Sequence, residues 1–504
     1  MGQQENGARD WWRIGDAAVL AAYAGLVLWT VPYHEKWADE AQAWLIARDL
    51  DLRTIWFHEL RYEGSPGLWH TILWIAQQVF RAKYDTLGYI GAGFAIGGAA
   101  VLLFLAPFPR IVRWPLAFTY VMVYQYAVIA RPYTLFPLLA FCAAVFFKDV
   151  LHPGRMTIPL VLLSLLTLHG TILAGCLGFA YLVEAYKRRV ELDSVVKRRY
   201  IISTIILALT FLFVVAILKP TPDVGEFAGK RELAQMSQAQ RELRQPSPLR
   251  KTEAILCGAF MDYTIPSILC VLLIGWWCYR RHRLLEYALP VALLIALYAL
   301  VHGYPHHHGT VFVATIAALW IAWPTVKEQS EFSRLDLWAT RAMIALLLCL
   351  CAVNIFDAEV VIHREYLYPY SGARDAADYI KEVGADKTPM FGFLFGVNAV
   401  QAYFDHNLFS NMSSSYYHNG LPLEGTSVSY EDLRRVRPQY VIAYSSAPQM
   451  MMDTGIPLLA GEGYELVHFS DGYYLYKRGV YQRETYFILK RTTASPLDPG
   501  DRHE

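Results

Sequence analysis

Long apolar runs recur along the first 358 residues of this 504-residue chain, and they constrain its fold more than any other feature. An apolar run of about 20 residues crosses a bilayer as a helix, because a helix satisfies its own backbone hydrogen bonds in lipid. Hydrophobic residues make up 55% of the sequence, which places the chain among the polytopic membrane proteins. The balance of 45 Lys and Arg against 44 Asp and Glu gives no reason to expect nucleic acid as a partner.

The first apolar run, Gly15 to Tyr33, follows a polar start, so we expect an uncleaved signal anchor. The run Gly67 to Phe80 spans only about fourteen residues, a length that favours a re-entrant or interfacial helix. If that run does not cross, the positive-inside rule holds along the chain, with about eleven spans and the N-terminus in the cytoplasm. The later spans lie near 86–105, 114–130, 132–147, 156–169, 171–186, 200–218, 263–279, 285–302, 308–325 and 339–357.

This topology places every basic cluster on the inner side, where Lys and Arg are enriched in short loops. The clusters are Arg110 and Arg113, Lys148 and Arg155, 187–189 with 197–199, Arg280, Arg281 and Arg283, and Lys327, Arg334 and Arg341. The candidate catalytic and ligand-binding residues then lie on the outer side. They lie in the first outer loop 34–85, the corner 130–133, His169-Gly170, the loop 219–262, the loop 302–308 and the tail.

The tail, residues 359–504, is expected to form an outer-face α/β domain behind a transmembrane module of residues 1–358. Ser371 is a candidate cap for a helix that ends near Glu382, with Ala373, Ala376, Ala377 and Ile380 on one face. Strands are predicted at 390–395, 440–444 and 464–469, with Asp471-Gly472 as a hairpin turn into 473–476. The many tyrosines either pack this small domain or stack on sugars.

Two other features carry less information. The seven cysteines show no ligand spacing such as C-x-x-C, so the sequence supports neither a disulfide framework nor a zinc site. The polar stretches Gln235–Gln245 and Thr492–Glu504 are expected to be solvated, and the first has the composition of a segment that folds when substrate binds.

Two adjacent carboxylates, Asp39 and Glu40, follow the first span where it leaves the membrane. Partial desolvation and a neighbouring like charge both raise the pKa of a carboxylic acid, which suits a general base. Acids at a membrane boundary are functional candidates, whereas the alternative is a pair of solvated loop charges. Asp39 is the first candidate for the base. Glu40 is a base, an orienting group or an acceptor ligand, and the sequence does not separate these roles.

A cationic side chain on the same face is a candidate for holding phosphate. Arg131, followed by Pro132 and Tyr133, begins a predicted span. Its planar guanidinium suits bidentate binding of phosphate, and the alternative is a snorkelling arginine at a helix end.

The loop from His302 supplies imidazoles to the same face, either for contacts to phosphate or sugar or as a structural loop. A metal site is disfavoured there, because consecutive histidines lack partner carboxylates or i, i+4 spacing. The donor-phosphate candidates are Arg131, Tyr133, His306, His307 and His308. The substrate-cavity candidates are Tyr62, Glu63, His70, His169 and Tyr304, although His169 also suits an interfacial role.

These motifs resemble the first outer loop of the C-type (GT-C fold) glycosyltransferases. The resemblance rests on Asp39-Glu40, the segment 62–68 before a short apolar helix, and the corner 130–133. It is strongest to protein O-mannosyltransferases and to aminoarabinose transferases acting on lipid A. It implies an α-helical polytopic membrane protein of about 11 transmembrane helices with a soluble α/β domain. It also implies Asp39 as base toward the acceptor and a polyprenyl-phosphate sugar donor, with inversion at the anomeric carbon.

Two departures limit what the resemblance implies. Metal-dependent oligosaccharyltransferases of this fold carry acidic residues just after an arginine in the second outer loop, whereas no acid follows Arg131 here. This difference favours metal-independent catalysis without a cofactor. Relatives often place His-Pro-Pro or Lys-Pro-Pro before the short helix, and this chain has Gly64-Ser65-Pro66. A phosphate-contacting cation is therefore missing there, unless Arg61 or His70 replaces it.

The sequence thus predicts an inverting glycosyltransferase of the inner (plasma) membrane that acts on the outer face. Its expected partners are a polyprenyl-phosphate-linked sugar, the lipid bilayer, and a lipid, glycan or protein acceptor. Two alternatives stay open: a lipid-linked-sugar flippase or transporter, and a non-catalytic carbohydrate-binding membrane protein. A transporter would favour paired broken helices in related halves, and no such repeat stands out.

Overall fold

The computed structural model describes residues 2–63, 65–219, 247–300, 303–412, 414–416 and 430–492. Several sequence predictions fall wholly or partly outside these ranges. They concern Gly64, the loop 219–262 with its stretch 235–245, His302, and the stretch 492–504 beyond its first residue.

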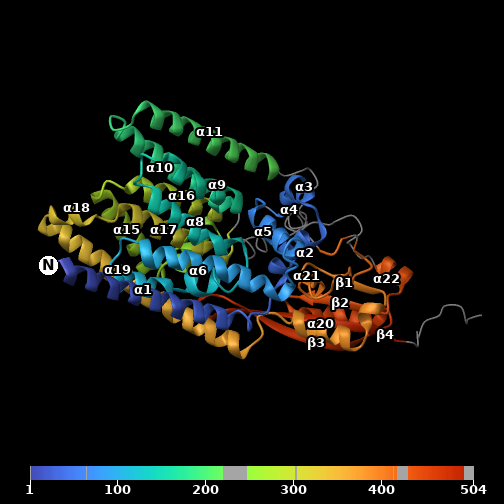
Figure 1. Cartoon of the computed structure of the whole chain (residues 1–504). Coiled ribbons are helices and arrows are strands. Elements are labelled where there is room, and N and C mark those ends of the chain that lie inside the picture. Colours follow the sequence, from blue (N-terminus) through green and yellow to red (C-terminus); the bar gives the residue numbers. More distant parts are fainter. Residues whose placement is uncertain are drawn as a thin grey trace, which may run out of the picture.

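A bundle of apolar helices makes up most of the molecule, and α1, α6, α11 and α19 run lengthwise through it (Figure 1). The helices are α1 (Gly2–Thr30), α6 (Leu87–Leu105), α7 (Arg110–Ala117), α8 (Phe136–Phe146), α9 (Pro153–Leu166), α10 (Leu168–Lys187), α11 (Ser194–Ile217), α14 (Pro248–Ala259), α15 (Thr264–Arg280), α16 (Leu284–Leu300), α17 (His308–Ala322), α18 (Val326–Ser330) and α19 (Arg334–Leu367). Each predicted span overlaps one of them. The residues of α17 are buried throughout, which makes it the central helix of the bundle.

Length distinguishes these helices from one another. Among the described residues, five helices are long and apolar enough to cross a membrane, or six if the pair α14–α15, bent by 75°, forms one span. The remaining predicted runs are represented by shorter apolar helices such as α9 and α16. The run 67–80 forms only α5 (Leu68–Gln78), which agrees with a helix too short to span.

The predicted span 114–130 is not a continuous helix. Helix α7 ends at Ala117, one π-helical turn covers Val121–Gln125, and the chain reaches Arg131 without further helix. Residues 119–130 of this segment are nevertheless all buried. Irregular backbone at membrane depth is tolerated where protein surrounds it, because other protein groups then satisfy its polar atoms.

The first outer loop folds back against one end of the bundle. It contains α2 (Ala38–Asp49), α3 (Leu52–Thr54), α4 (Leu60–Glu63) and α5. Helix α2 consists largely of strong helix formers, and most of its residues are buried. The reason is that α5 and α21 (Val397–Gln401) of the tail both pack against it.

The tail forms a four-stranded sheet with helices at the same end of the bundle (Figure 1). The strand order is β1-β2-β4-β3, with β1 (Met390–Phe393), β2 (Tyr440–Ser445), β3 (Tyr464–Leu475) and β4 (Tyr481–Arg491). Strand β1 pairs with β2 in parallel, and the other two pairings are antiparallel. The predicted helix is α20 (Ala373–Glu382), and its four predicted apolar residues are buried. Several of the tyrosines, such as Tyr474 and Tyr486, are buried in this domain.

The predicted hairpin turn at Asp471-Gly472 is wrong, because β3 continues through both residues. Asp471 accepts hydrogen bonds from Arg483 and Thr485 across the sheet, and it therefore bridges two strands. Gly472 is required for a close approach: a Cβ there would lie 2.5 Å from Cα of Ser371. The turn comes later, where Arg478 and Gly479 have positive φ, and the sequence reading missed β4 altogether.

One of the clusters predicted for the inner side, Arg280, Arg281 and Arg283, pairs with acids of other helices near α18, at the end of the bundle opposite the tail. Ion pairs join α15, its following turn, α10, α18 and α19 there (Figure 1). They are Arg283–Glu184 (2.7 Å), Arg280–Asp336 (2.7 Å) and Arg281–Glu328 (3.5 Å). The ends of α10 and α15, helix α18 and the start of α19 therefore meet there.

The contact at Gly472 generates a stability prediction. We expect Gly472→Ala to lower the apparent Tm of the detergent-solubilised protein by several degrees, since overpacking against backbone costs about 1–3 kcal/mol. Gly461→Ala is the matched control, because no atom lies within 4 Å of its added Cβ. Equal unfolding temperatures for the two variants, measured by intrinsic fluorescence, would contradict this account of Gly472.

Candidate active site

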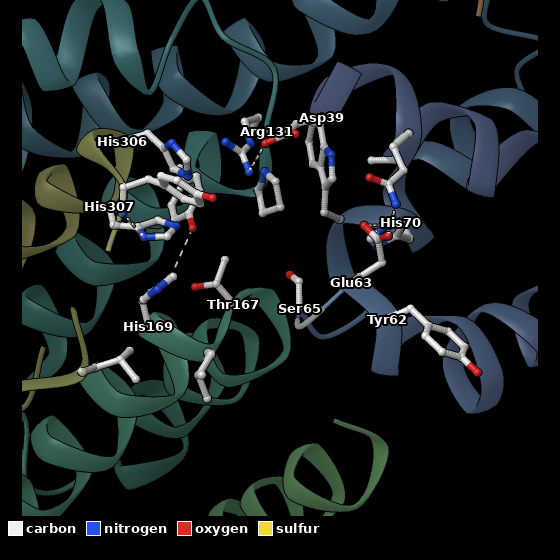
Figure 2. A pocket seen from close by; sticks show the side chains of 18 of the residues that line it. Asp39, Tyr62, Glu63, Ser65, His70, Arg131, Thr167, His169, His306 and His307 are labelled. Carbon is white, nitrogen blue, oxygen red and sulfur yellow. Dashed lines mark hydrogen bonds and ion pairs between the residues drawn. The ribbon is translucent and has the colours of Figure 1, made fainter. Parts of the chain in front are cut away.

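A cavity of about 310 Å³ opens between the first loop, the helical bundle and the tail. Its walls come from segments far apart in the sequence, as Figure 2 shows. The lining residues are Asp39, Gln42, Ala43, Tyr62, Glu63, Ser65, Trp69, His70, Arg131, Pro132, Tyr133, Thr167, Leu168, His169, Leu297, Tyr304, His306, His307 and Phe395. All the predicted site residues except Glu40 and His308 are among them.

Helix α2 places Asp39 at the cavity wall. Asp39 lies in the first turn, where the helix dipole favours a negative charge. Its neighbour Glu40 does not line the cavity and is fully buried. The Glu40 carboxylate also accepts the backbone N–H of Trp37 at 3.3 Å, which fixes the start of the helix.

Glu40 belongs to a buried charge cluster rather than to the cavity. Its Oε2 lies 2.9 Å from Nε2 of His34, and its Oε1 accepts the backbone N–H of Ala130 at 2.7 Å. The other ring nitrogen of His34 lies 2.8 Å from Glu365, near the end of α19. Tyr124 donates to the second oxygen of Glu365 at 2.5 Å. One cluster therefore ties the first loop, the broken segment before Arg131 and the last bundle helix together.

The protonation of this cluster follows from its geometry. Burial opposes a charge on His34, but Glu40 and Glu365 on either side raise its pKa to about 10. Burial alone would raise the pKa of Glu40, yet His34 and the N–H of Ala130 hold that pKa below its ordinary value. At neutral pH a protonated His34 thus lies between two carboxylates.

Arg131 lies next to Asp39 on the cavity wall, and their closest atoms, Nη2 and Oδ2, are 2.9 Å apart. The Arg131 guanidinium also lies near the rings of Trp37 and Tyr133, at 5.5 and 5.6 Å from their centroids. Its Nη1 has no hydrogen-bond partner among the described residues. A buried N–H donor beside a cavity is therefore left for a ligand.

The pKa of Asp39 reflects two opposing causes. Burial raises it, the Arg131 guanidinium lowers it, and the nearby charges of Glu63 and Glu40 raise it again. The net result is a pKa above the ordinary value of an aspartate. The carboxylate still has 21% of its side-chain surface exposed, so it remains reachable from the cavity. A reachable carboxylate with a raised pKa has the properties of a general base.

Aromatic and imidazole rings form the wall next to Arg131. The Tyr133 hydroxyl lies 3.3 Å from Nδ1 of His169, and the rings of His169 and His307 are 4.7 Å apart. Nδ1 of His307 accepts the backbone N–H of Tyr304 at 3.1 Å, so the neutral ring carries its proton on Nε2. This wall brings together the corner, the start of α10 and the predicted histidine loop.

The opposite wall comes from the first loop. Gln42 donates to Glu63, whose second carboxylate oxygen lies 3.8 Å from Nε2 of His70. Figure 2 shows Glu63 and His70 next to each other, while the Tyr62 ring points away from Asp39 and Arg131. Ser65 donates to the carbonyl of Leu166 at 3.2 Å, which anchors the loop to the bundle.

His308 was predicted as a phosphate ligand, but it does not line the cavity. It begins α17 and packs against α14, where a Cβ on Gly258 would collide with its ring. Sequence reasoning also missed several lining residues, including Gln42, Thr167, Leu297 and Phe395. Gln42 was detectable as a polar residue one helical turn from Asp39. Phe395 carried no signal, because only the tertiary fold brings the tail to this cavity.

Across the described ranges, no three His, Cys, Asp or Glu side chains come together as candidate ligands of one ion. In the cavity, the group that faces the Asp39 carboxylate is the guanidinium of Arg131.

Comparisons with known proteins identify the fold. No family model and no curated protein sequence matches the chain. Two solved structures do: ArnT from Cupriavidus metallidurans bound to undecaprenyl phosphate, and the same protein in the apo state. The first has a TM-score of 0.55 at 14% identity and covers 95% of this chain and 99% of ArnT. The second has a TM-score of 0.53 at 13% identity, covering 97% and 100%. The predicted GT-C fold is thereby confirmed over nearly the whole chain.

Proposed function

We propose that this protein is an inverting glycosyltransferase that moves a sugar from a polyprenyl-phosphate carrier to a hydroxyl acceptor at the outer face of the membrane. The observation that carries the proposal is the pairing of Asp39 with Arg131 on one wall of a cavity. The fold supports it, because the ArnT structure that shares it holds undecaprenyl phosphate. The multipass protein would lie in the inner membrane with its N-terminus in the cytoplasm and its tail outside.

Asp39 is proposed as the base of a single displacement. It removes the proton from the acceptor hydroxyl while the acceptor oxygen forms a bond to the anomeric carbon. The bond from that carbon to the phosphate oxygen breaks, and its electron pair leaves with the polyprenyl phosphate. Inversion follows, because the attacking and leaving oxygens lie on opposite sides of the carbon.

The leaving phosphate is assigned to Arg131 and the adjacent rings. Arg131 has an unpartnered buried Nη1, and the imidazoles of His306 and His307 lie beside Tyr133, within 6 Å between ring centroids. Donors fixed in a desolvated cavity stabilise developing negative charge by several kcal/mol each, without reorganisation during the reaction. Glu63, His70 and Gln42 on the opposite wall are left to hold the sugar or acceptor hydroxyls.

Glu40 is proposed as a positioning residue for Asp39. Both of its carboxylate oxygens are engaged, by His34 and by the N–H of Ala130, and it does not line the cavity. Since Ala130 precedes Arg131, this one side chain fixes the backbone on both sides of the Asp39–Arg131 pair.

Catalysis without a metal ion is part of the proposal. In metal-dependent sites, a cation draws charge from the leaving phosphate. Here Arg131 supplies a permanent positive charge next to the carboxylate that would otherwise be a ligand. Addition of EDTA to the turnover assay is therefore expected to leave the rate unchanged.

Replacement of the base is the first test. We expect Asp39→Asn to lower turnover by about 10²–10⁴-fold, because an amide cannot accept the acceptor proton. The assay measures release of undecaprenyl phosphate from a panel of undecaprenyl-phosphate-linked sugars, with an extract of cell-envelope lipids and glycans as acceptors. Asp405→Asn, which changes an exposed acid of the tail, is the matched control. Full turnover in Asp39→Asn would refute the role of Asp39 and favour a transport or binding protein.

The raised pKa of Asp39 predicts a pH dependence. The base must be ionised, so kcat/KM should fall as the pH drops through the pKa of Asp39, at a pH above the ordinary value for aspartate of about 3.9. Arg131 lowers that pKa, so Arg131→Gln should shift the acid limb of the residual activity to higher pH. An acid limb that stays in place in Arg131→Gln would contradict the assignment.

Glu40→Gln distinguishes positioning from catalysis. We expect kcat to fall by about 10–100-fold, with the KM for the donor changed by less than about twofold, since a displaced base loses turnover rather than binding. Loss of the Glu40 charge should also lower the pKa of Asp39, so the acid limb should move to lower pH. Glu465→Gln, an exposed acid on β3, is the control. A loss as severe as that in Asp39→Asn, without an acid limb, would make Glu40 the base.

A further inference from the structure

A second cavity has a volume of about 410 Å³, and Lys36, three residues before Asp39, lines it. Residues after α1, residues before and within α6, and residues of α20 in the tail line it, together with Tyr403. It shares no lining residue with the first cavity. Nothing in the proposed mechanism uses it.

Lys36 is the unusual residue in this cavity. Only 3% of its surface is exposed, yet its ammonium has no hydrogen bond or ion pair with any described residue. Its Nζ lies 5.2 Å from the ring centroid of Tyr84. Buried charges are costly unless they are paired, and the other buried charges nearby, such as His34 and Glu40, are paired. Lys36 therefore has no directly paired carboxylate among the described residues, although the charges of Glu40, Asp85 and Glu35 act on it from a greater distance.

Two further cations reach the cavity from α20. Arg374 is half-buried and lies 3.9 Å from Asp85, and Lys381 lies over the rings of Tyr403 and Phe404. The acids of the cavity do not neutralise this set. Asp85 is 78% exposed and Asp378 is also exposed, so water screens both charges, whereas it cannot reach Lys36 to the same extent.

The cavity lies at the boundary of the apolar bundle. Val31 and Pro32 directly follow α1, and Tyr89 is in the first turn of α6, and both helices are candidate membrane spans. Lipid headgroups occupy this level of a membrane, while acyl chains lie alongside the helices. A ligand that combines an anionic head with an apolar tail therefore matches both the cations and the position.

We propose that this second cavity binds the phosphate headgroup of a membrane lipid, with Lys36 as its buried counter-ion and with Arg374 and Lys381 at its mouth. The phosphate supplies the directly paired negative charge that Lys36 lacks among the described residues, in the manner of other desolvated ammonium–phosphate pairs. Burial lowers the pKa of Lys36, and the bound anion opposes that effect because it stabilises the charged ammonium. The site is separate from the catalytic cavity and does not depend on the proposed transfer reaction.

Binding of dihexanoyl phosphatidic acid to the full-length protein in phosphatidylcholine nanodiscs tests the proposal. Calorimetric titration should show two sites, of which Arg131→Gln weakens one and Lys36→Gln the other. We expect Lys36→Gln to weaken its site by about 30-fold, as for loss of one partner of a buried charge pair. Lys381→Gln should weaken the same site by about threefold, since its charge is exposed. Lys387→Gln, an exposed lysine of the tail outside both cavities, should change neither site.

The outcomes separate the possibilities. Unchanged binding in both Lys36→Gln and Lys381→Gln would overturn the site, and Lys381→Gln alone decides the matter if Lys36→Gln does not fold. Equal binding of dihexanoyl phosphatidylcholine would overturn the requirement for an anionic headgroup. Inorganic phosphate that binds the Lys36 site as tightly as the lipid would overturn the lipid as its source, whereas at least tenfold weaker binding would support it.

Discussion

The contact on which the site depends is the buried imidazolium of His34 between Glu40 and Glu365. Each of these groups would be destabilising alone in a dry environment, and in the cluster the single imidazolium pairs with both carboxylates. Their three positions belong to the first loop and to the end of the last bundle helix, more than 300 residues apart in the chain. The same cluster binds the N–H of Ala130. The geometry of Asp39 and Arg131 is therefore a property of the whole bundle and not of a local motif.

The break in the chain before Arg131 contributes to this arrangement. A regular helix through 114–130 would use the N–H of Ala130 in its own hydrogen-bond ladder. Because the helix is interrupted, that N–H is available to Glu40, and the corner can place Arg131 toward the cavity. The same rule explains why the irregular segment is buried, since only protein groups can satisfy its backbone there. The sequence shows this segment as one apolar run, and that is why the hydropathy pattern predicted a span.

The sequence predicted those features that depend on local patterns of residues. Apolar runs predicted most of the bundle helices. The structure also brings the predicted corner, histidine loop and first loop together around one cavity. Signals that depend on tertiary contacts were misread. Gly472 resembles a turn residue, but it is needed for the approach of Ser371 in the middle of a strand. His308 differs from His307 by one position, and that position turns its side chain toward α14. Lys36 is an ordinary loop lysine in the sequence, because its burial depends on the tail.

The residues of the His34 cluster lie far apart in the chain, and this separation has a consequence for biosynthesis. His34 and Glu40 emerge from the ribosome early, whereas Glu365 and the tail that covers them come last. Until α19 has been inserted, the early charges lack half of their partners and must remain hydrated at the membrane surface. The first loop therefore reaches its final packing only after the complete bundle is in the membrane. A nascent chain that stops before α19 would hold helices but no assembled site.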